Sequence, residues 1–162
     1  RYKDGHIEQR WMDEHIKLTK GETIQFENDL VDDNLNDLTW WTTKHNNYAT
    51  REAVDILNII HEFINYDEVN SNFFGTQEER KRFLKKKYAN LPLFTRPFIY
   101  FLWRYFIKLG FLDGKQGLIW HFLQGFWYRF LVDAKIYEIE KKAKDSNLSL
   151  KETLIQKYGF IL

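Results

Sequence analysis

Residues 92–132 read PLFTRPFIYFLWRYFIKLGFLDGKQGLIWHFLQGFWYRFLV, two apolar arms joined by a short glycine-rich turn. The whole chain has 14 Phe, 9 Tyr and 6 Trp, and 14 of these rings lie between Phe94 and Phe130. A soluble core rarely needs so many large rings in so short a stretch, whereas Tyr and Trp favour the boundary between water and lipid. We therefore predict that this aromatic hairpin contacts a membrane.

Polar residues recur along both arms at helical spacing. In the first arm they are four residues apart and form one stripe: Arg96, Tyr100, Arg104 and Lys108. In the second arm they leave a narrow strip on an apolar surface: His121, Gln124, Tyr128 and Arg129. Neither arm reaches the roughly 18 uncharged apolar residues of a spanning helix. At mid-bilayer, Arg104 would also cost about 2.5–3.5 kcal/mol if it faced lipid. We expect two amphipathic helices in the membrane interface, with their charged heads reaching the phosphates.

A basic segment precedes the hairpin and strengthens the membrane prediction. Between Arg80 and Lys87 six of eight residues are basic, and each would contribute about 1 kcal/mol beside an anionic leaflet. Nucleic acid is disfavoured as a partner, because the neighbouring rings lie in apolar runs and form no exposed stacking platform. The expected membrane contacts are Arg80, Lys81, Lys85, Phe98, Phe101, Trp103, Arg104, Trp120, Phe126 and Trp127. In the alternative arrangement the rings pack against each other and a further domain, and the lysines are only solvated.

The composition bounds the class of protein. A chain of 162 residues can bury a core as one domain or slightly more. It lacks cysteine, which excludes disulfides, zinc–thiolate sites and thiol catalysis and fits a reducing compartment. Its 24 basic and 23 acidic residues nearly cancel, so net charge identifies no partner. It begins at Arg1 with neither an initiator methionine nor a signal peptide, and we therefore expect it to be part of a longer protein.

The local patterns predict a mainly helical fold with a small strand-bearing remnant at the front. Polar and apolar residues alternate over 22–27, which is typical of a half-buried strand. Asn34 and Asp37 resemble a capping box that opens a helix over about 35–63. Thr76 is expected to cap a basic helix to about residue 91, and further helices are expected over 97–109, 115–144 and 149–158, with a turn at 110–114. We divide the chain into residues 1–34 and a helical extension over 35–162.

Three segments, taken in order, carry a resemblance to a known enzyme family. The first is RWMDEH at 10–15, and the second is WWTTKHNNYA at 40–49, followed by Arg51, Glu52 and Ala53. The third combines Arg96-Pro97, the turn GFLDG at 110–114, Gly117, Lys135 and Tyr137-Glu138. Their order and spacing resemble bacterial family 2 glycosyltransferases, which build lipopolysaccharide core, capsule or other lipid-linked glycans. The similarity covers most of residues 5–140.

The resemblance implies an enzyme with two parts. A nucleotide-binding α/β domain of the GT-A type would hold the nucleotide-sugar donor and a divalent metal, Mg or Mn, through an aspartate motif. Transfer to a lipid-linked acceptor would invert the anomeric carbon at the cytoplasmic face of the bacterial inner membrane. No Asp-x-Asp motif at a strand end is visible, and Asp32-Asp33 precedes a predicted helix. We therefore expect the C-terminal part of such an enzyme, without a cofactor of its own and inactive alone.

An acidic segment is the candidate for the chemistry. An inverting transfer needs a carboxylate that removes the proton of the acceptor hydroxyl. Position in the family pattern favours Glu14 as this base over Asp13, with Trp11 packing a sugar face and His15 orienting the carboxylate or reaching a metal. Acid pairs are common on protein surfaces, so these residues alone do not establish catalysis. A metal site of His6, Glu8, Asp13 and His15 can be drawn, but its spacing matches no strong ligand pattern, and we predict no metal on this part of the chain.

A second candidate group lies on the helix predicted over 35–63. Trp41, His45, Tyr48 and Glu52 fall on one side of it, with Lys44 beside them. A lysine, a histidine and a tyrosine together (Lys44, His45 and Tyr48) would suit a phosphate of the donor or of a lipid-diphosphate acceptor. In the alternative the helix packs its Trp and Tyr rings into the core, and His45 hydrogen-bonds Glu52 or a neighbouring carbonyl.

Two non-catalytic functions are weighed against the enzyme. The chain would then be an interfacial anchor that holds another enzyme at a membrane, or a helical domain whose aromatic hairpin docks a partner protein. An upstream α/β domain with an Asp-x-Asp motif would favour the glycosyltransferase. Binding to lipid vesicles would separate the anchor from the protein-interaction domain.

Overall fold

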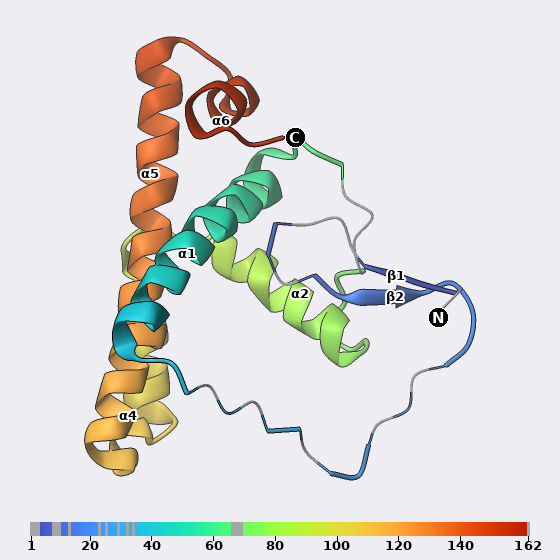
Figure 1. The fold of residues 1–162 in the computed structure, drawn as a ribbon, viewed down its shortest axis with the longest axis vertical. Coiled ribbons are helices and arrows are strands. Elements are labelled where there is room, and N and C mark those ends of the chain that lie inside the picture. Colours follow the sequence, from blue (N-terminus) through green and yellow to red (C-terminus); the bar gives the residue numbers. More distant parts are fainter. Residues whose placement is uncertain are drawn as a thin grey trace.

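The computed structural model describes residues 4–7, 11–12, 14–22, 24, 26–28, 30–31, 33, 35–65 and 70–161. This part of the chain is mainly helical and carries a two-stranded antiparallel sheet, which confirms the predicted class at that level (Figure 1). The strands are β1 (Gly5–Ile7) and β2 (Ile16–Leu18). The helices are α1 (Leu38–His61), α2 (Gln77–Ala89), α3 (Thr95–Leu102), α4 (Gly114–Trp120), α5 (Tyr128–Ser146) and α6 (Leu150–Tyr158). The hairpin also contains two π-helical segments, η1 (Trp103–Ile107) and η3 (His121–Trp127), and the 3-10 turn η2 (Gly110–Asp113).

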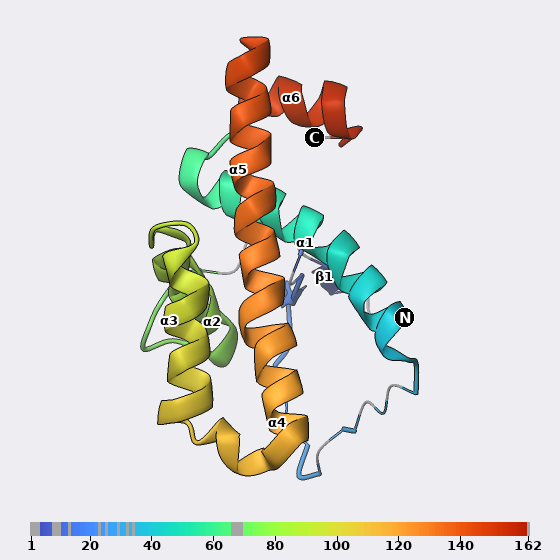
Figure 2. The same cartoon turned by 90° about the vertical axis from the view of Figure 1, so that its left-hand side faces the viewer.

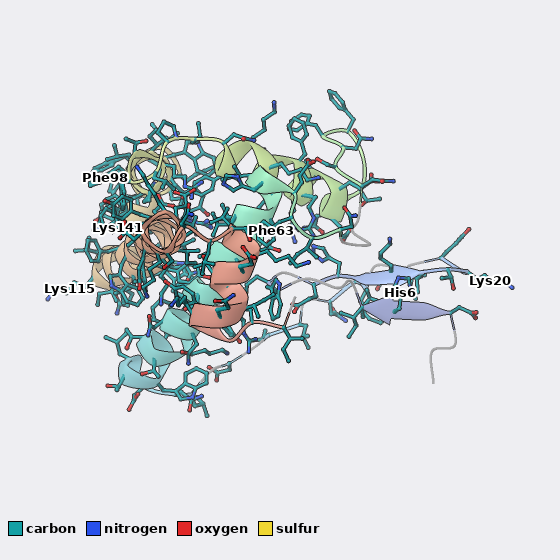
Figure 3. All side chains as sticks on the ribbon, turned by 90° about the horizontal axis from the view of Figure 1, so that it is seen from above. His6, Lys20, Phe63, Phe98, Lys115 and Lys141 are labelled. Atoms are coloured by element: carbon teal, nitrogen blue, oxygen red, sulfur yellow. The ribbon has the colours of Figure 1, made fainter. Side chains whose placement is uncertain are left out.

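Helix α5 runs along the long axis of the molecule, and α1 crosses it (Figures 1 and 2). Helices α4, η3 and α5 follow one another without a break from Gly114 to Ser146, so the second arm of the hairpin is the first part of a long rod. Helix α3 continues into η1 and packs beside η3 as the first arm. The small sheet projects from the helical body on the side away from Phe98 and Lys115 (Figure 3).

The core lies where α1 crosses α5. Ala49 and Ala53 of α1 are fully buried, and their small side chains let the two helices approach closely. The other buried aliphatic side chains of this cluster are Val54, Ile56, Leu57, Val132, Ile136, Ile139 and Leu154. Full burial of each Val, Leu or Ile stabilises the fold by about 1.5–3 kcal/mol. Most of this core is therefore aliphatic, and from the hairpin rings it takes Tyr128 and, partly buried, Trp127.

Side-chain caps fix the starts of α1, α2 and α6. Helix α1 begins at Leu38, later than predicted, because Asp37 is the N-cap and its Oδ1 accepts a hydrogen bond from the Trp40 amide at 2.8 Å. Asn34, the other half of the predicted capping box, lies outside the described residues. The predicted cap at Thr76 is confirmed, since Thr76 and Glu79 form a capping box at the start of α2. Helix α6 begins with the same arrangement at Ser149.

The strand predicted over 22–27 was wrong. Among the described residues of this range no strand forms, and Ile24 and Phe26 are 81% and 80% exposed. A strand needs a hydrogen-bonded neighbouring strand and a face that is buried. Alternating polar and apolar side chains do not show that either is present. The paired strands lie earlier in the chain, where Gly5 is opposite Leu18 and His6 is opposite Lys17.

Close packing requires two glycines at the turn of the hairpin. A Cβ on Gly110 would lie 2.2 Å from Nε2 of His121, and a Cβ on Gly117 would lie 2.4 Å from the carbonyl oxygen of Gly110. Both positions therefore need a residue without a side chain, because the turn presses against the second arm. The predicted turn is confirmed as η2, which is followed by Gly114 with a φ of 64°.

The polar stripe of the first arm starts in the interior of the protein. Arg96 is fully buried, and its Nε donates to Oδ1 of Asp133 and its Nη1 to the carbonyl of Ala89, each at 2.8 Å. The other oxygen of Asp133 accepts a hydrogen bond from the Phe94 amide at 2.8 Å. The expectation that the whole stripe reaches lipid phosphates was therefore wrong for Arg96, because Asp133 on α5 neutralises it inside the fold.

Candidate functional site

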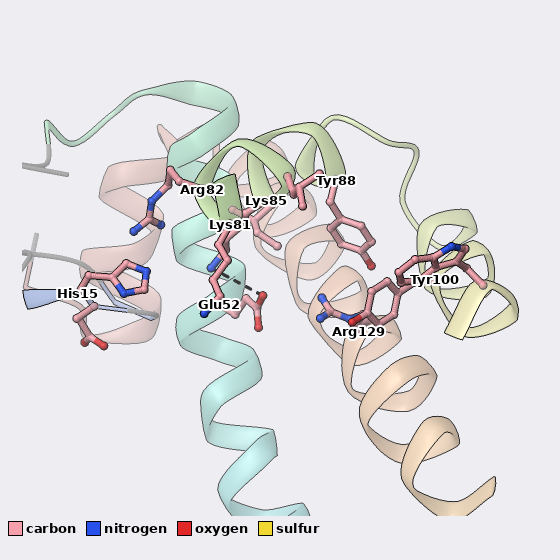
Figure 4. A pocket seen from close by; sticks show the side chains of 12 residues that line it. His15, Glu52, Lys81, Arg82, Lys85, Tyr88, Tyr100 and Arg129 are labelled. Atoms are coloured by element: carbon pink, nitrogen blue, oxygen red, sulfur yellow. Dashed lines mark ion pairs between the residues drawn. The ribbon is translucent and has the colours of Figure 1, made fainter. Parts of the chain in front are cut away.

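A cleft of about 750 Å³ opens between the segment before β2, helices α1 and α2, and the hairpin (Figure 4). Residues from distant parts of the sequence meet there, among them Glu14, His15, Lys81, Arg82, Tyr100 and Arg129. The lining thus combines carboxylates, cationic groups and aromatic rings. A polar ligand that carries an apolar portion would match this mixture.

The segment predicted to carry the chemistry contributes two residues to the cleft. Glu14 is exposed and His15 is half-buried, and both line the cleft. Asp13 lies outside the described residues. The ring of Trp11 packs edge-on against Phe160, with the ring centroids 4.9 Å apart, and joins the edge of the core. The structure therefore brings Glu14 and His15 together at a cleft and places the predicted sugar platform elsewhere.

The metal site drawn from the N-terminal segment cannot be followed as a whole, since Glu8 and Asp13 lie outside the described residues. Within the described part of the chain, no group of three or more His, Cys, Asp or Glu residues is placed to hold a metal ion. His6 is exposed on β1.

Glu52 belongs to a network of buried charges beside the cleft. The hydroxyl of Tyr128 donates to Oε2 of Glu52 at 2.5 Å. The ammonium of Lys85 lies 3.1 Å from Oδ2 of Asp55. It also lies 3.9 Å from Oε1 of Glu52, an ion pair that Figure 4 shows as a dashed line. Asp55 is fully buried, so this pairing replaces the water that its charge would otherwise need. Lys85, predicted to contact lipid, therefore joins α2 to α1.

Arg129 enters the cleft from α5 beside two phenol rings. Its guanidinium carbon lies 4.1 Å from the ring centroid of Tyr100 and 5.3 Å from that of Tyr88. Burial alone would lower the pKa of Arg129, but the charge of Glu52 and the two phenols outweigh it and raise the pKa. Burial raises the pKa of Tyr88 to about 12, so this phenol keeps its proton at neutral pH.

The second predicted group, on α1, is held by its own helix. The ring of His45 stacks on Trp41 with centroids 3.6 Å apart, and its Nδ1 is 2.8 Å from the Trp41 carbonyl. Burial lowers the pKa of His45, which favours the neutral imidazole. The ammonium of Lys44 lies over the rings of Trp40 and Tyr48, at 4.7 and 5.3 Å from their centroids. None of Lys44, His45 and Tyr48 lines the cleft, and the alternative of a bond from His45 to a neighbouring carbonyl is confirmed.

The two arms of the hairpin present large apolar side chains to solvent. We call this set the apolar surface, and each of its side chains is at least 43% exposed: Phe98, Ile99, Leu102, Trp103, Phe106, Ile107, Leu109, Phe111, Leu112, Leu118, Ile119, Trp120 and Phe122. Figure 3 shows Phe98 at the outer edge of the helical body. No described helix has both the length and the apolarity needed to cross a bilayer.

The predicted membrane contacts divide into exposed and packed residues. Phe98, Trp103 and Trp120 belong to the apolar surface, and Arg80 and Lys81 are exposed on α2. The other rings are half-buried between helices: Phe101 and Phe126 lie 6.2 Å apart, and Trp127 lies 6.2 Å from Trp41. Arg104 is also half-buried, with its guanidinium carbon 5.7 Å from the ring centroid of Tyr100.

Seven residues that line the cleft were not predicted as site residues: Glu52, Ile56, Arg82, Leu84, Tyr88, Tyr100 and Arg129. Helical spacing had placed Tyr100 on the polar stripe of the first arm and Arg129 on the strip of the second. Spacing within each helix does not tell whether two stripes face each other, because that depends on how the helices pack. Tyr88 carried no pattern of its own in the sequence.

Comparisons with protein-family models, with curated proteins and with solved structures found no match for this chain.

Proposed function

We propose that this chain is the C-terminal, acceptor-side part of an inverting glycosyltransferase resembling family 2. It would transfer a sugar from a nucleotide-sugar donor to a lipid-linked glycan acceptor at the cytoplasmic face of the bacterial inner membrane. The observation that carries the proposal is that Glu14 and Trp103 line the same cleft, so a candidate base and the apolar surface meet in one place. The resemblance of the segments at 10–15, 40–53 and 96–138 supports the same reading.

In the proposed reaction Glu14 takes the proton of the acceptor hydroxyl while the hydroxyl oxygen forms the new bond to the anomeric carbon. The bond from that carbon to the nucleotide diphosphate breaks, and its electron pair leaves with the diphosphate. Attack from the face opposite the leaving group inverts the configuration. His15, which lines the same cleft, would orient the carboxylate or the acceptor.

The donor and its metal belong to a GT-A-like domain in this proposal. A divalent ion there would neutralise the charge that develops on the leaving diphosphate. The residues described in this chain offer no group of ligands for such an ion, so the donor-binding domain would supply them. This chain would contribute the base, the acceptor cleft and the membrane contact.

The apolar surface supports a peripheral attachment to the membrane. Amphipathic helices bind in the interface through the apolar area that they bury and through attraction to anionic lipids. The arms offer the first of these, and the exposed Arg80 and Lys81 of α2 offer the second. Attachment of this kind would hold the cleft at the level of the lipid headgroups, where a lipid-linked acceptor carries its glycan.

Replacement of the proposed base is the direct test. In the full-length enzyme, Glu14→Gln keeps the size of the side chain but removes the proton acceptor, so turnover should fall by about 10²–10⁴-fold. Donor binding, measured by titration with the nucleotide-sugar, should stay unchanged. Glu27→Gln is the matched control, because Glu27 is an exposed carboxylate of the same N-terminal segment outside the cleft. Normal turnover of Glu14→Gln would remove Glu14 from the reaction.

The apolar surface by itself also favours the second candidate, a non-catalytic interfacial anchor. Such a protein would bind vesicles as well as the enzyme would, but its parent protein would show no sugar transfer that depends on Glu14. Vesicle binding together with an unchanged Glu14→Gln variant would therefore select the anchor over the glycosyltransferase.

A further inference from the structure

Arg129 is partly buried, and its partners differ from those of Arg96, which is fully buried. Arg96 forms an ion pair with Asp133 and donates to a backbone carbonyl. Arg129 forms no ion pair with a carboxylate of the described residues, and its Nε is buried without a hydrogen-bond partner. The charge of Glu52 raises the pKa of Arg129, but the carboxylate oxygens of Glu52 contact Tyr128 and Lys85. A partly buried guanidinium with a buried donor that has no partner is a candidate for binding a ligand.

The surroundings of Arg129 suit an anion that carries several acceptor oxygens. Lys81 and Arg82 of α2 line the same cleft, whereas Lys85, which also lines it, already pairs with Asp55 and Glu52. The phenol of Tyr88 stays protonated beside Arg129 and can donate a hydrogen bond. Arginine presents a fork of donors that matches the oxygens of phosphate, and lysine adds charge.

The position of Trp103 indicates how such an anion would arrive. Trp103 lines the cleft and is also 47% exposed as part of the apolar surface. An anion bound at Arg129 would therefore have an apolar exit toward the bilayer, which suits a phosphate esterified to a lipid. A free phosphate would use the cationic groups and leave the apolar exit empty.

We propose that the Arg129 end of the cleft binds the phosphate or diphosphate of a lipid-linked acceptor, with the lipid leaving past Trp103. The inference rests on the proposed function for the identity of this ligand as an acceptor. It replaces the earlier assignment of the phosphate to Lys44, His45 and Tyr48, which do not line the cleft. With the phosphate at Arg129, the attached glycan would extend along the cleft toward Glu14.

The test measures binding of the 162-residue chain to three sets of vesicles. They consist of phosphatidylcholine alone, phosphatidylcholine with a small fraction of a polyprenyl phosphate, and phosphatidylcholine with phosphatidylglycerol at the same surface charge. The polyprenyl phosphate should strengthen binding by about tenfold or more over phosphatidylglycerol. Arg129→Gln should abolish this preference while binding to the other vesicles persists, and Arg129→Lys should keep part of it.

Two further variants keep the test valid if Arg129→Gln fails to fold. Lys81→Gln changes an exposed side chain of the cleft and should weaken the preference, whereas Lys87→Gln, on the same helix but outside the cleft, should not. Equal binding to both anionic vesicles, or an unchanged preference in Lys81→Gln and Arg129→Lys, would overturn the site. Titration with inorganic pyrophosphate distinguishes a free phosphate from a lipid-linked one. If pyrophosphate binds as tightly as the polyprenyl phosphate, the proposed role of the lipid is overturned.

The vesicle-binding test does not depend on whether Glu14 is the catalytic base. Glu14→Gln should retain the full preference for polyprenyl phosphate, since Glu14 is assigned to the hydroxyl and not to the phosphate. If the unchanged chain does not prefer polyprenyl phosphate but turnover still requires Glu14, the phosphate site alone is rejected. If the chain prefers polyprenyl phosphate but turnover does not require Glu14, sugar transfer through Glu14 is rejected and the phosphate site is kept.

Discussion

Arg96 and Arg129 occupy similar stripes of the two arms, yet their surroundings differ in kind. Arg96 meets a carboxylate and a carbonyl, and Arg129 meets two phenol rings. The sequence predicted that both residues lie on polar stripes of amphipathic helices. It assigned the stripe of Arg96 to the membrane surface. The partner of Arg96, Asp133, follows 37 residues later, and the packing of α5 brings the two side chains together, so this ion pair could not be predicted from the sequence. For the same reason, the ion pair between Lys85 and Asp55 could not be predicted from the basic segment over 80–87.

The ion pair of Arg96 predicts a large loss of stability when its acid is removed. Asp133→Asn leaves the arginine charge buried without compensation, so the free energy of unfolding should fall by about 3–5 kcal/mol. Urea unfolding followed by circular dichroism measures it. Lys142→Ala is the control, because it removes an exposed pair with Glu138 at 2.7 Å, and such pairs contribute less than about 1 kcal/mol. A similar small loss in both variants would contradict this role of Asp133.

At the scale of elements, helices were predicted better than strands. Caps and proline positions located α2, α3 and α6, because the signals for a helix start lie within four residues of it. The strand at 22–27 failed since pairing is not local, and the π-helical segments η1 and η3 left no recognisable pattern. The glycines at 110–117 predicted a turn, but only the structure explains Gly117, which lies inside α4 and faces the Gly110 carbonyl.

The contact of Gly117 predicts opposite effects for two glycines on the same rod. Gly117→Ala would push a methyl group into the Gly110 carbonyl, and overpacking of this kind destabilises a fold by about 1–3 kcal/mol. Gly125→Ala is the matched control, because a Cβ there meets no atom within 4 Å. Alanine favours the helical state over glycine by about 1 kcal/mol, so this control should be neutral or stabilising. Thermal unfolding of both variants checks the prediction, and equal melting temperatures would disprove the packing argument.

At the scale of the whole molecule, the interior is largely aliphatic and many of the aromatic rings lie outside. The composition indicated that the hairpin has more rings than a soluble core usually needs in so short a stretch, and the exposed side chains of both arms agree. The cleft could not be predicted, since it joins residues 14, 81, 103 and 129 from four separate segments. Only the resemblance singled out Glu14, and no local pattern indicated that Arg129 would lie in the same cleft.

The exposed rings predict binding to lipid vesicles that depends on their position. Full burial of a Phe side chain contributes about 1.5–3 kcal/mol, so Phe106→Ser with Trp120→Ser should weaken partition into anionic vesicles by at least about tenfold. Co-sedimentation measures this partition. Val31→Ser with Ile155→Ser is the matched control, because both side chains are exposed outside the hairpin. An equal effect of the two pairs, or no vesicle binding by the unchanged chain, would contradict a membrane contact through the arms.

In the proposed membrane-bound state, Trp103 would lie between the cleft and the acyl layer of the bilayer. Moving a hydrocarbon tail out of a bilayer costs about 0.8 kcal/mol for each CH₂ group. A substrate that enters sideways past Trp103 would keep its tail among neighbouring lipids and turn only its head into the protein. Selection would then depend on the head alone, so short and long polyprenyl chains should serve equally well once both are dissolved in the same bilayer.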